Sequence, residues 1–503
     1  MDETKHVEES VQISSYTQVI LIVLVTTFGI MMLTKKRYKL PPGPWAVPMI
    51  GNILSFVNTS FDRNLSKWHK KYGPVFSFSI GRRRMVVINE PEALNEALVK
   101  KGSDFSGRPY LYSMSIATQG NKSILMSTYG DGWKLQRKIA SHALRQYLTG
   151  RQLEERVHEV LQPIIRNMLE REEAFDPHMH LSLTVFNILL GICFGTVMEL
   201  DDPEFVGLIN LFDEANDLFG NGFLEDFFPP LRLYPTKKFT RTMELFGKFN
   251  QFIYSRLQEQ KEKFDPENVT NLTDNIILAK QEVEADTKSP VSALFTDTHA
   301  SQTLGDVFGG GVDTTRIQLG WIFLVISTRP DIKEKVQEEV DRVIGDKIPG
   351  KEHRAKLVYT EAVMLEAMRL FPVAPLGVPH ETLQDTTIGD YEIPAKTTVF
   401  PNQIEILHDP NLWEDPLTFK PERFLDESGT KLVAKGQGWV PFSMGHRVCL
   451  GESLARLQIL YVLAGLVQKL NFSLSKDSCP DLKCNQDGLV NKPKKYKLIV
   501  TSR

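Results

Sequence analysis

The sequence predicts a mainly α-helical fold with a small β region, and two patterns along the chain carry this prediction. Apolar residues recur at helical spacing in five long segments, which are 133–148, 151–170, 243–263, 331–344 and 450–470. Three shorter runs bounded by Gly or Pro, at 75–80, 85–88 and 397–400, predict the strands of a small accessory sheet. Because no linker, low-complexity tract or repeat of fixed period follows the first 44 residues, we expect 41–503 to form one domain.

The composition excludes several classes of protein. Apolar residues make up 42% and charged residues 24% of the 503-residue chain, which is typical of a globular protein. The 59 Lys and Arg residues nearly balance the 62 Asp and Glu residues, and no long basic tract occurs, so we expect no nucleic-acid binding. Four cysteines in so long a chain argue against a disulfide framework and indicate a reducing compartment. We expect Cys479 and Cys484 to be free thiols.

The amino terminus predicts a membrane anchor. Residues 16–33 form an uncharged apolar stretch that would span about 27 Å as a helix, enough to cross a thin bilayer. A cleaved secretory signal is the alternative, but here acidic residues precede the stretch and basic residues follow it within 35–39. The positive-inside rule therefore predicts that 1–40 is a single-pass transmembrane anchor with its basic flank and that the remainder faces the cytosol. The prolines of 41–44 cannot continue a helix and predict a stiff hinge.

The most specific pattern in the chain runs from Phe442 to Gly451, with Gly445, Arg447 and Cys449 at fixed offsets before an apolar helix. Backbone N–H groups at a helix N-terminus stabilise a thiolate, which is the form of cysteine that binds a metal. Arg447 is placed to meet an anionic group of a cofactor. A buried structural cysteine would be the better interpretation if Cys449 stood alone, but its neighbours favour a cofactor ligand.

At these residues the sequence resembles the cytochrome P450 superfamily, whose other motifs follow in order along the chain. The resemblance implies a cytochrome P450 fold that binds haem b, with Cys449 as the axial ligand of the iron and Phe442 among the cofactor-binding residues. Glu366, Arg369 and Arg423 match an acid, a base and a Pro-Glu-Arg-Phe arginine of the family. The resemblance implies that these three side chains form a buried structural network, although the spacing of Glu366 and Arg369 alone is more typical of a solvated surface pair.

Three consecutive glycines at 309–311 interrupt an otherwise helical pattern. Each Gly inside a helix costs roughly 0.5–1 kcal/mol relative to Ala, so a loop between two helices is one interpretation. The resemblance implies the other interpretation, a helix across the haem in which small residues leave room for O2 and substrate. Asp313 and Thr314 then match the acid and alcohol that deliver protons, and Gly310 belongs to the substrate pocket.

Four further residues resemble contacts to the haem propionates of this family. Trp133 and Arg137 stand at i, i+4 on a predicted helix and match one pair of such contacts, while Arg108 and His380 match two others. Each has an ordinary alternative, because an amphipathic helix or a capping or surface residue produces the same local sequence.

Within the family, the sequence is similar to the animal microsomal enzymes that include steroid 17-alpha-hydroxylase/17,20-lyase, steroid 21-hydroxylase and the aryl-hydrocarbon hydroxylases. This similarity implies an endoplasmic-reticulum monooxygenase that takes NADPH electrons from NADPH-cytochrome P450 reductase, with cytochrome b5 as a further candidate partner. Lys134 and Lys138 are candidate reductase contacts. Val378 and Leu489 would line a pocket for a lipophilic small molecule.

The expected substrate is a steroid, and a xenobiotic, aryl hydrocarbon or fatty acid is the alternative within the same reaction class. Two other classes of protein compete with a monooxygenase: an enzyme that rearranges a peroxide without a reductase, and a non-catalytic haem sensor. A relay pair such as Asp313 and Thr314 argues against both, since neither needs protons delivered to reduced O2.

Overall fold

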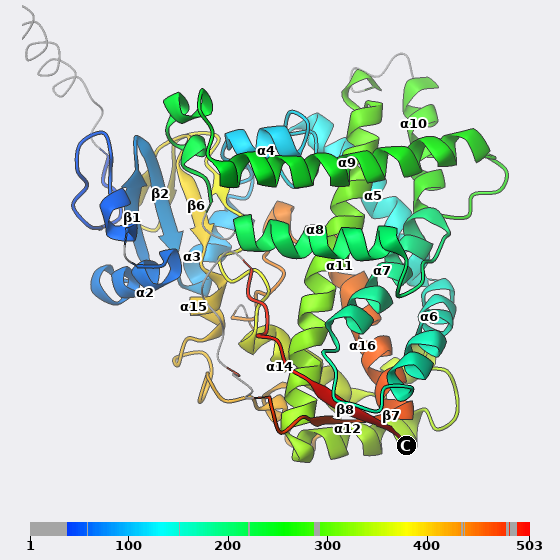
Figure 1. The fold of residues 1–503 in the computed structure, drawn as a ribbon. Helices are drawn as coiled ribbons and strands as arrows, with labels where there is room; N and C mark the ends of the chain where they lie inside the picture. Colours follow the sequence, from blue (N-terminus) through cyan, green and yellow to red (C-terminus); the bar gives the residue numbers. More distant parts are fainter. Residues whose placement is uncertain are drawn as a thin grey trace, which may run out of the picture.

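The structure, a computed structural model, describes residues 38–503 apart from 58, 150, 220–221, 286–291, 434–435, 437, 479–481 and 483–489. The predicted anchor, Cys479, Cys484 and Leu489 lie outside the described residues. Among the residues that are described, no helix is both long and apolar enough to cross a membrane. The described part is mainly helical with a small β content, as predicted, and its strands form three small sheets where one had been expected (Figure 1).

The α-helices of the described residues are α2 (Phe61–Tyr72), α3 (Pro91–Asn95), α4 (Tyr112–Ala117), α5 (Asp131–Thr149), α6 (Gln152–Leu169), α7 (His178–Phe194), α8 (Pro203–Phe219), α9 (Lys237–Lys263), α10 (Leu272–Ala285), α11 (Asp297–Thr328), α12 (Pro330–Val343), α13 (Lys351–Arg354), α14 (Val358–Leu370), α15 (Gln403–Leu407) and α16 (Glu452–Lys469). The five predicted helices correspond to α5, α6, α9, α12 and α16 within a few residues at each end, except that α9 begins six residues earlier.

The main sheet has the strand order β1-β2-β6-β3 and lies to one side of the helical part (Figure 1). Its strands are β1 (Val75–Ile80), β2 (Arg83–Ile88), β3 (His380–Glu381) and β6 (Thr398–Pro401). β1 and β2 form an antiparallel hairpin with Val75 opposite Ile88, whereas β2 and β6 pair in parallel with Met85 opposite Thr398. Two small antiparallel sheets pair β4 (Thr386–Ile388) with β5 (Tyr391–Ile393) and β7 (Leu470–Leu474) with β8 (Leu498–Ser502).

Helix α11 runs through the centre of the helical part (Figure 1). Thr296 precedes its first turn and donates its backbone N–H to Nδ1 of His299 at 3.2 Å, while Pro330 ends the helix by starting α12. Trp321 in its second half is fully buried, and its ring stacks on Phe371 at 4.3 Å. The core therefore anchors the second half of α11.

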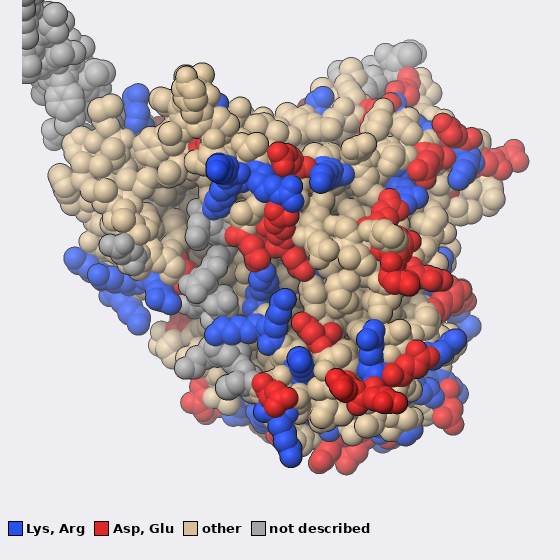
Figure 2. Space-filling model, viewed as in Figure 1, with Lys and Arg blue, Asp and Glu red and all other residues tan. Residues whose placement is uncertain are grey.

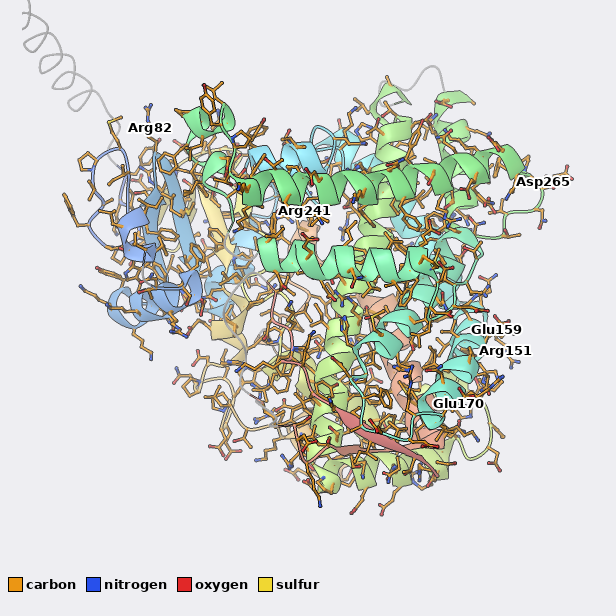
Figure 3. All side chains as sticks on the ribbon, in the orientation of Figure 1. Arg82, Arg151, Glu159, Glu170, Arg241 and Asp265 are labelled. Atoms are coloured by element: carbon orange, nitrogen blue, oxygen red, sulfur yellow. The ribbon has the colours of Figure 1, made fainter. Side chains whose placement is uncertain are left out.

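Helices α8 and α9 form a pair beside α11. Arg241 on α9 points toward α8 in Figure 3, where its Nε and Nη2 donate to the two carboxylate oxygens of Glu214 at 2.6 and 2.7 Å. Asn216 of α8 and Phe249 of α9 both contact α11. The pair thus covers the part of α11 that carries the glycine run.

Candidate functional site

The loop before α16 holds Cys449 in a fixed conformation. The Cys449 N–H donates to the carbonyl oxygen of Phe442 at 3.0 Å, which closes the loop. Gly445 has a φ of +73°, and a Cβ at this position would lie 1.8 Å from the carbonyl oxygen of Leu98. Only glycine fits this approach, which explains its place in the sequence pattern. The Phe442 ring lies 6.0 Å from that of Trp439 and packs against the main core.

The sulfur of Cys449 lies at the N-terminal end of α16, beside the N–H groups of Gly451 and Glu452. The surrounding protein raises the pKa of the thiol by desolvation, whereas the N–H groups of Gly451 and Glu452 and the charge of Arg137 act against this rise. These groups favour the thiolate that a metal would bind.

Arg447 stacks on Trp133, with the guanidinium carbon 4.3 Å from the ring centroid. Both side chains are buried, and both donate to the same backbone oxygen, that of Ile124, at 3.0 Å. Arg447 also donates to the carbonyl oxygens of Ser106 and Ser127. The indole N–H, which the family resemblance assigns to a propionate, is thus used by a backbone carbonyl in this structure.

Arg108, Arg137 and His380 lie in one cluster with Arg447. The three arginines carry the positive charge, whereas desolvation and the charge of Arg108 lower the pKa of His380 well below its ordinary value. Arg108 is buried and donates to the carbonyl oxygens of Leu125, Val378 and Pro379 at 2.9, 3.1 and 2.7 Å. Arg137 donates to Val448 O at 2.6 Å, and Nδ1 of His380 lies 2.8 Å from Phe105 O. These partners are neutral carbonyls, so they do not offset the positive charge.

The electrostatics of this cluster favour an anionic ligand. Desolvation lowers the pKa of Arg447 to about 9, with repulsion from Arg137 as the next cause. The pKa of Arg108 also falls well below its ordinary value because of desolvation and of repulsion from Arg447 and Arg137. Since guanidinium groups stay protonated in proteins, these shifts mean that the cluster holds its positive charge at a cost in free energy. A group with two carboxylates, such as the propionates of haem, would offset that cost, so these residues fit the cofactor.

The three glycines lie inside the continuous helix α11, which excludes the alternative of a loop between two helices. A Cβ at Gly309 would come within 2.9 Å of the Phe249 ring, and one at Gly311 within 2.8 Å of Leu189. A Cβ at Gly310 would meet nothing within 4 Å. Gly309 and Gly311 therefore allow close packing of helices, while Gly310 faces open space, the position expected for a substrate pocket.

Thr314 follows Gly310 by one turn and is exposed, with its hydroxyl donating to the Gly310 carbonyl at 2.7 Å. Asp313 is held from two sides. Asn216 of α8 donates to both carboxylate oxygens at 3.0 and 2.9 Å, and Arg316 donates to Oδ1 through Nε and Nη2 at 3.1 and 2.7 Å. The acid and the alcohol are thus adjacent, but the acid is tied to a buried arginine.

Arg316 extends this network to α7 and α8. Its Nη2 also donates to Asp213 at 2.9 Å, and the other oxygen of Asp213 lies 2.9 Å from Nε2 of His178. Burial disfavours ionisation of Asp213, but His178 and Arg316 outweigh it and lower the pKa to about 2. The i, i+3 spacing of Asp313 and Arg316 was a signal that the sequence offered, whereas the roles of Asn216, Asp213 and His178 depend on how the helices cross.

Glu366, Arg369 and Arg423 form one network. Arg369 donates to both oxygens of Glu366 at 2.7 and 2.8 Å, and Arg423 donates to Oε1 at 3.1 Å. The side chains of Glu366 and Arg369 have no exposed surface. Arg369 and Arg423 also donate to backbone carbonyls of the segment that leads to the cysteine loop, at Leu407 and Glu414.

Sequence reasoning missed a half-buried aspartate on α11. Oδ2 of Asp306 accepts the backbone N–H groups of Ile124 and Leu125 at 2.5 and 3.3 Å. Burial raises the pKa of Asp306 to about 7, and the two N–H donors only partly oppose the rise. Two glycines follow this aspartate at i+3 and i+4, but nothing in the sequence pairs it with a segment about 180 residues away.

Comparison with known proteins agrees with this geometry. Residues 41–500 match the family model described as cytochrome P450. The chain is 34% identical to cytochrome P450 1A1 of Limanda limanda over 99% of this chain and 97% of that protein. It is 34% identical to the 1A1 protein of Oncorhynchus mykiss over 96% of each chain, and 33% identical to that of Rattus norvegicus over 92% and 91%. The family model and these relatives match nearly the whole chain, and the site is built around a cysteine thiol and a cationic cluster. This chain therefore belongs to the cytochrome P450 family and is a haem-dependent monooxygenase.

Proposed function

We propose that this monooxygenase hydroxylates lipophilic aromatic molecules at the surface of the endoplasmic-reticulum membrane, with electrons supplied by NADPH-cytochrome P450 reductase. The relatives named above carry the 1A designation, and they favour the aryl-hydrocarbon or xenobiotic alternative over the steroid that we expected first. The observation that carries the site assignment is the open position at Gly310, one turn before the exposed hydroxyl of Thr314.

One set of residues would bind the cofactor, and another would deliver protons. Cys449 would bind the iron, and Arg108, Arg137, Arg447 and His380 would hold the propionate side. When bound through a cysteine thiolate, haem supplies the activation of O2 and the transfer of one oxygen atom. The hydroxyl of Thr314 would hold a proton donor in place, and Asp313 would resupply it.

The surroundings of Gly310 suit a flat apolar ligand. Phe249 packs against Gly309, and its ring lies 5.5 Å from that of Phe212. We infer that these two rings border the open position on α11, where they would stack on a planar substrate. Val378, whose carbonyl binds Arg108, is half-buried and would contribute to the other side of the pocket.

A spectroscopic screen tests the substrate class. Polycyclic aromatic hydrocarbons and steroids of similar size are titrated into the haem-loaded full chain, and the change of haem spin state is followed. We expect the aromatic hydrocarbons to bind more tightly and to yield hydroxylated product only with O2, NADPH and reductase. Tight binding and turnover of steroids alone would favour the steroid substrate that the sequence first suggested. Product formed from a peroxide without reductase would overturn the monooxygenase assignment.

An apolar surface supports the membrane location. Trp45, Met49, Leu233 and Tyr234 are 77–86% exposed. Their two segments are neighbours, because a Cβ at Gly81 would lie 3.9 Å from the carbonyl oxygens of both Met49 and Phe227. Figure 2 shows mostly uncharged side chains over this end of the molecule. Such a surface is suited to contact with lipid beside an N-terminal anchor.

Lys134 and Lys138 on α5 are both exposed, as a docking role for reductase requires. Lys134 also lies 3.4 Å from Asp131. Changing either lysine to Glu should raise the reductase concentration needed for half-maximal turnover, with substrate binding unchanged. If cytochrome b5 is a second electron donor, it would compete with the reductase for the same surface. Titration of cytochrome b5 against reductase would show this competition.

A further inference from the structure

The segment 123–127 lies between Asp306 and the cationic cluster. On one side, the N–H groups of Ile124 and Leu125 donate to Asp306 of α11. On the other side, the carbonyl oxygen of Ile124 accepts from Trp133 and Arg447, and that of Leu125 accepts from Arg108. The two residues thus bind an acidic side chain through their N–H groups and cationic or indole donors through their carbonyl groups.

This arrangement orients the backbone of the segment electrostatically. A hydrogen bond that a carboxyl group accepts from the N–H polarises the backbone and strengthens the hydrogen bonds that the neighbouring carbonyls accept. Ile124 is buried, so its backbone groups cannot replace a lost partner with bulk water at little cost. The positions of Arg108, Trp133 and Arg447 therefore depend on a contact that is made by α11.

The segment is also held by local hydrogen bonds within residues 121–127, among them one from the Ser127 hydroxyl to the Asn121 carbonyl at 2.8 Å. The Met126 N–H donates to the Ser123 hydroxyl at 3.1 Å, and the Ser127 N–H donates to the Ser123 carbonyl at 2.8 Å. These bonds shape a turn and do not set its distance from α11. The two hydrogen bonds to Asp306 join the turn to this helix.

We propose that Asp306 is a positioning residue that holds the 123–127 segment and, through its carbonyl groups, the cationic cluster that retains haem. This inference rests on the proposed role of Arg108 and Arg447 at the propionate side. Through this contact, helix α11, which borders the substrate position, would affect the affinity for haem. A change at Asp306 would reach the cationic cluster through the backbone of Ile124 and Leu125.

The test measures haem loss from the full-length holoenzyme, by transfer of haem to excess apomyoglobin, for Asp306→Ala and Asp306→Asn. Loss of the acceptor in Asp306→Ala should speed transfer about tenfold, which corresponds to about 1.4 kcal/mol. Asp306→Asn keeps an oxygen that accepts both N–H groups and should stay within about twofold of the wild-type rate. Asp297→Asn is the matched control, because Asp297 lies on the same helix but pairs with Lys261 and Lys280.

Hydrogen exchange of the Ile124 and Leu125 amides supplies a readout that does not depend on haem transfer. These amides should exchange faster in Asp306→Ala than in Asp306→Asn or Asp297→Asn, and unchanged exchange would overturn the proposal. Arg447→Gln separates the two assumptions. If it speeds haem loss while Asp306→Ala does not, the coupling is wrong. If Arg447→Gln has the wild-type rate, the propionate assignment fails, and exchange alone decides whether Asp306 holds the segment.

Discussion

Glu366 and Arg369 form a bidentate ion pair in which neither side chain has any exposed surface. The same carboxylate accepts the Arg423 guanidinium and the backbone N–H of Lys420 at 3.0 Å. One buried carboxylate thus joins α14 to the segment that precedes the cysteine loop. The pair is worth little as a net source of stability, but removal of one partner leaves a buried charge without compensation.

Glu366→Gln should therefore lower the free energy of unfolding by about 3–5 kcal/mol, measured by urea denaturation of the haem-loaded protein. Glu422→Gln is the control from the neighbouring segment, because Glu422 pairs with Lys335 where both side chains are about half exposed. That change should cost about 1 kcal/mol or less. Equal losses in the two variants would contradict the distinction between buried and solvated pairs.

Cys449→Ser should abolish the ferrous–CO absorption band that is typical of thiolate ligation, because a neutral hydroxyl cannot replace the sulfur as ligand. Cys193→Ala is the control. Cys193 is fully buried on α7, and desolvation raises the pKa of its thiol, so it is not a candidate ligand. Haem content and the CO spectrum are measured together, and a wild-type band in Cys449→Ser would show that another residue binds the iron.

Thr314→Ala should reduce product formed per NADPH, with the lost electrons appearing as hydrogen peroxide, because the hydroxyl that positions the proton donor is gone. Stability should change by only about 1 kcal/mol. Thr315→Val is a matched control, since the buried Thr315 hydroxyl has no hydrogen-bond partner within the described part of the chain. If Thr314→Ala couples as well as Thr315→Val, the relay does not use Thr314.

The pKa of Asp306, raised to about 7 by burial, predicts how stability depends on pH. Between about pH 4 and 7 the native carboxyl keeps a proton that the unfolded chain has lost, so this group stabilises the fold at low pH and the contribution is lost as pH rises. Asp306→Asn removes the carboxyl group and with it this dependence of stability on pH. The variant should therefore gain stability relative to wild type from pH 5 to pH 8 in urea titrations.

Asp297→Asn is the control for that experiment, because the pKa of Asp297 is lowered, whereas that of Asp306 is raised. A hydrogen bond from Lys261 is the main cause that lowers the pKa of Asp297, so its stabilising contribution is complete above about pH 4 and should not change between pH 5 and 8. A difference between wild type and Asp306→Asn that stays constant over this range would show that Asp306 does not titrate there.

The proposed cytosolic orientation predicts that no Asn-x-Ser/Thr sequence carries a glycan. Asn64 and Asn271 are buried and could not accept one after folding, but Asn121, Asn268 and Asn471 are at least partly exposed. Treatment of protein from animal cells with a glycosidase should leave its electrophoretic mobility unchanged. A shift that is lost in Asn268→Gln would place the domain in the lumen.

Four of the five predicted helices, α5, α6, α9 and α12, have one apolar and one polar face, whereas α16 is buried along most of its length. Helix α7 did not appear among the predicted helices, because every residue from His180 to Phe194 is buried and no polar stripe marks the helical period. The cysteine loop and the glycine run were found because local geometry dictates their sequence. Asp306 and Asn216 were missed because their partners come from other segments, which only tertiary packing brings close.

The parallel pairing of β2 with β6 has a consequence for how the protein is made. About 310 residues separate Ile88 from Thr398, so the inner edge of the first hairpin has no partner until most of the chain has left the ribosome. At usual rates of synthesis this takes roughly 15 to 60 s. During that time a strand with four buried apolar residues, Met85 to Ile88, exposes unpaired backbone groups to other chains. We therefore expect the newly made N-terminal segment to need a chaperone or membrane contact, and overexpression to aggregate through this edge.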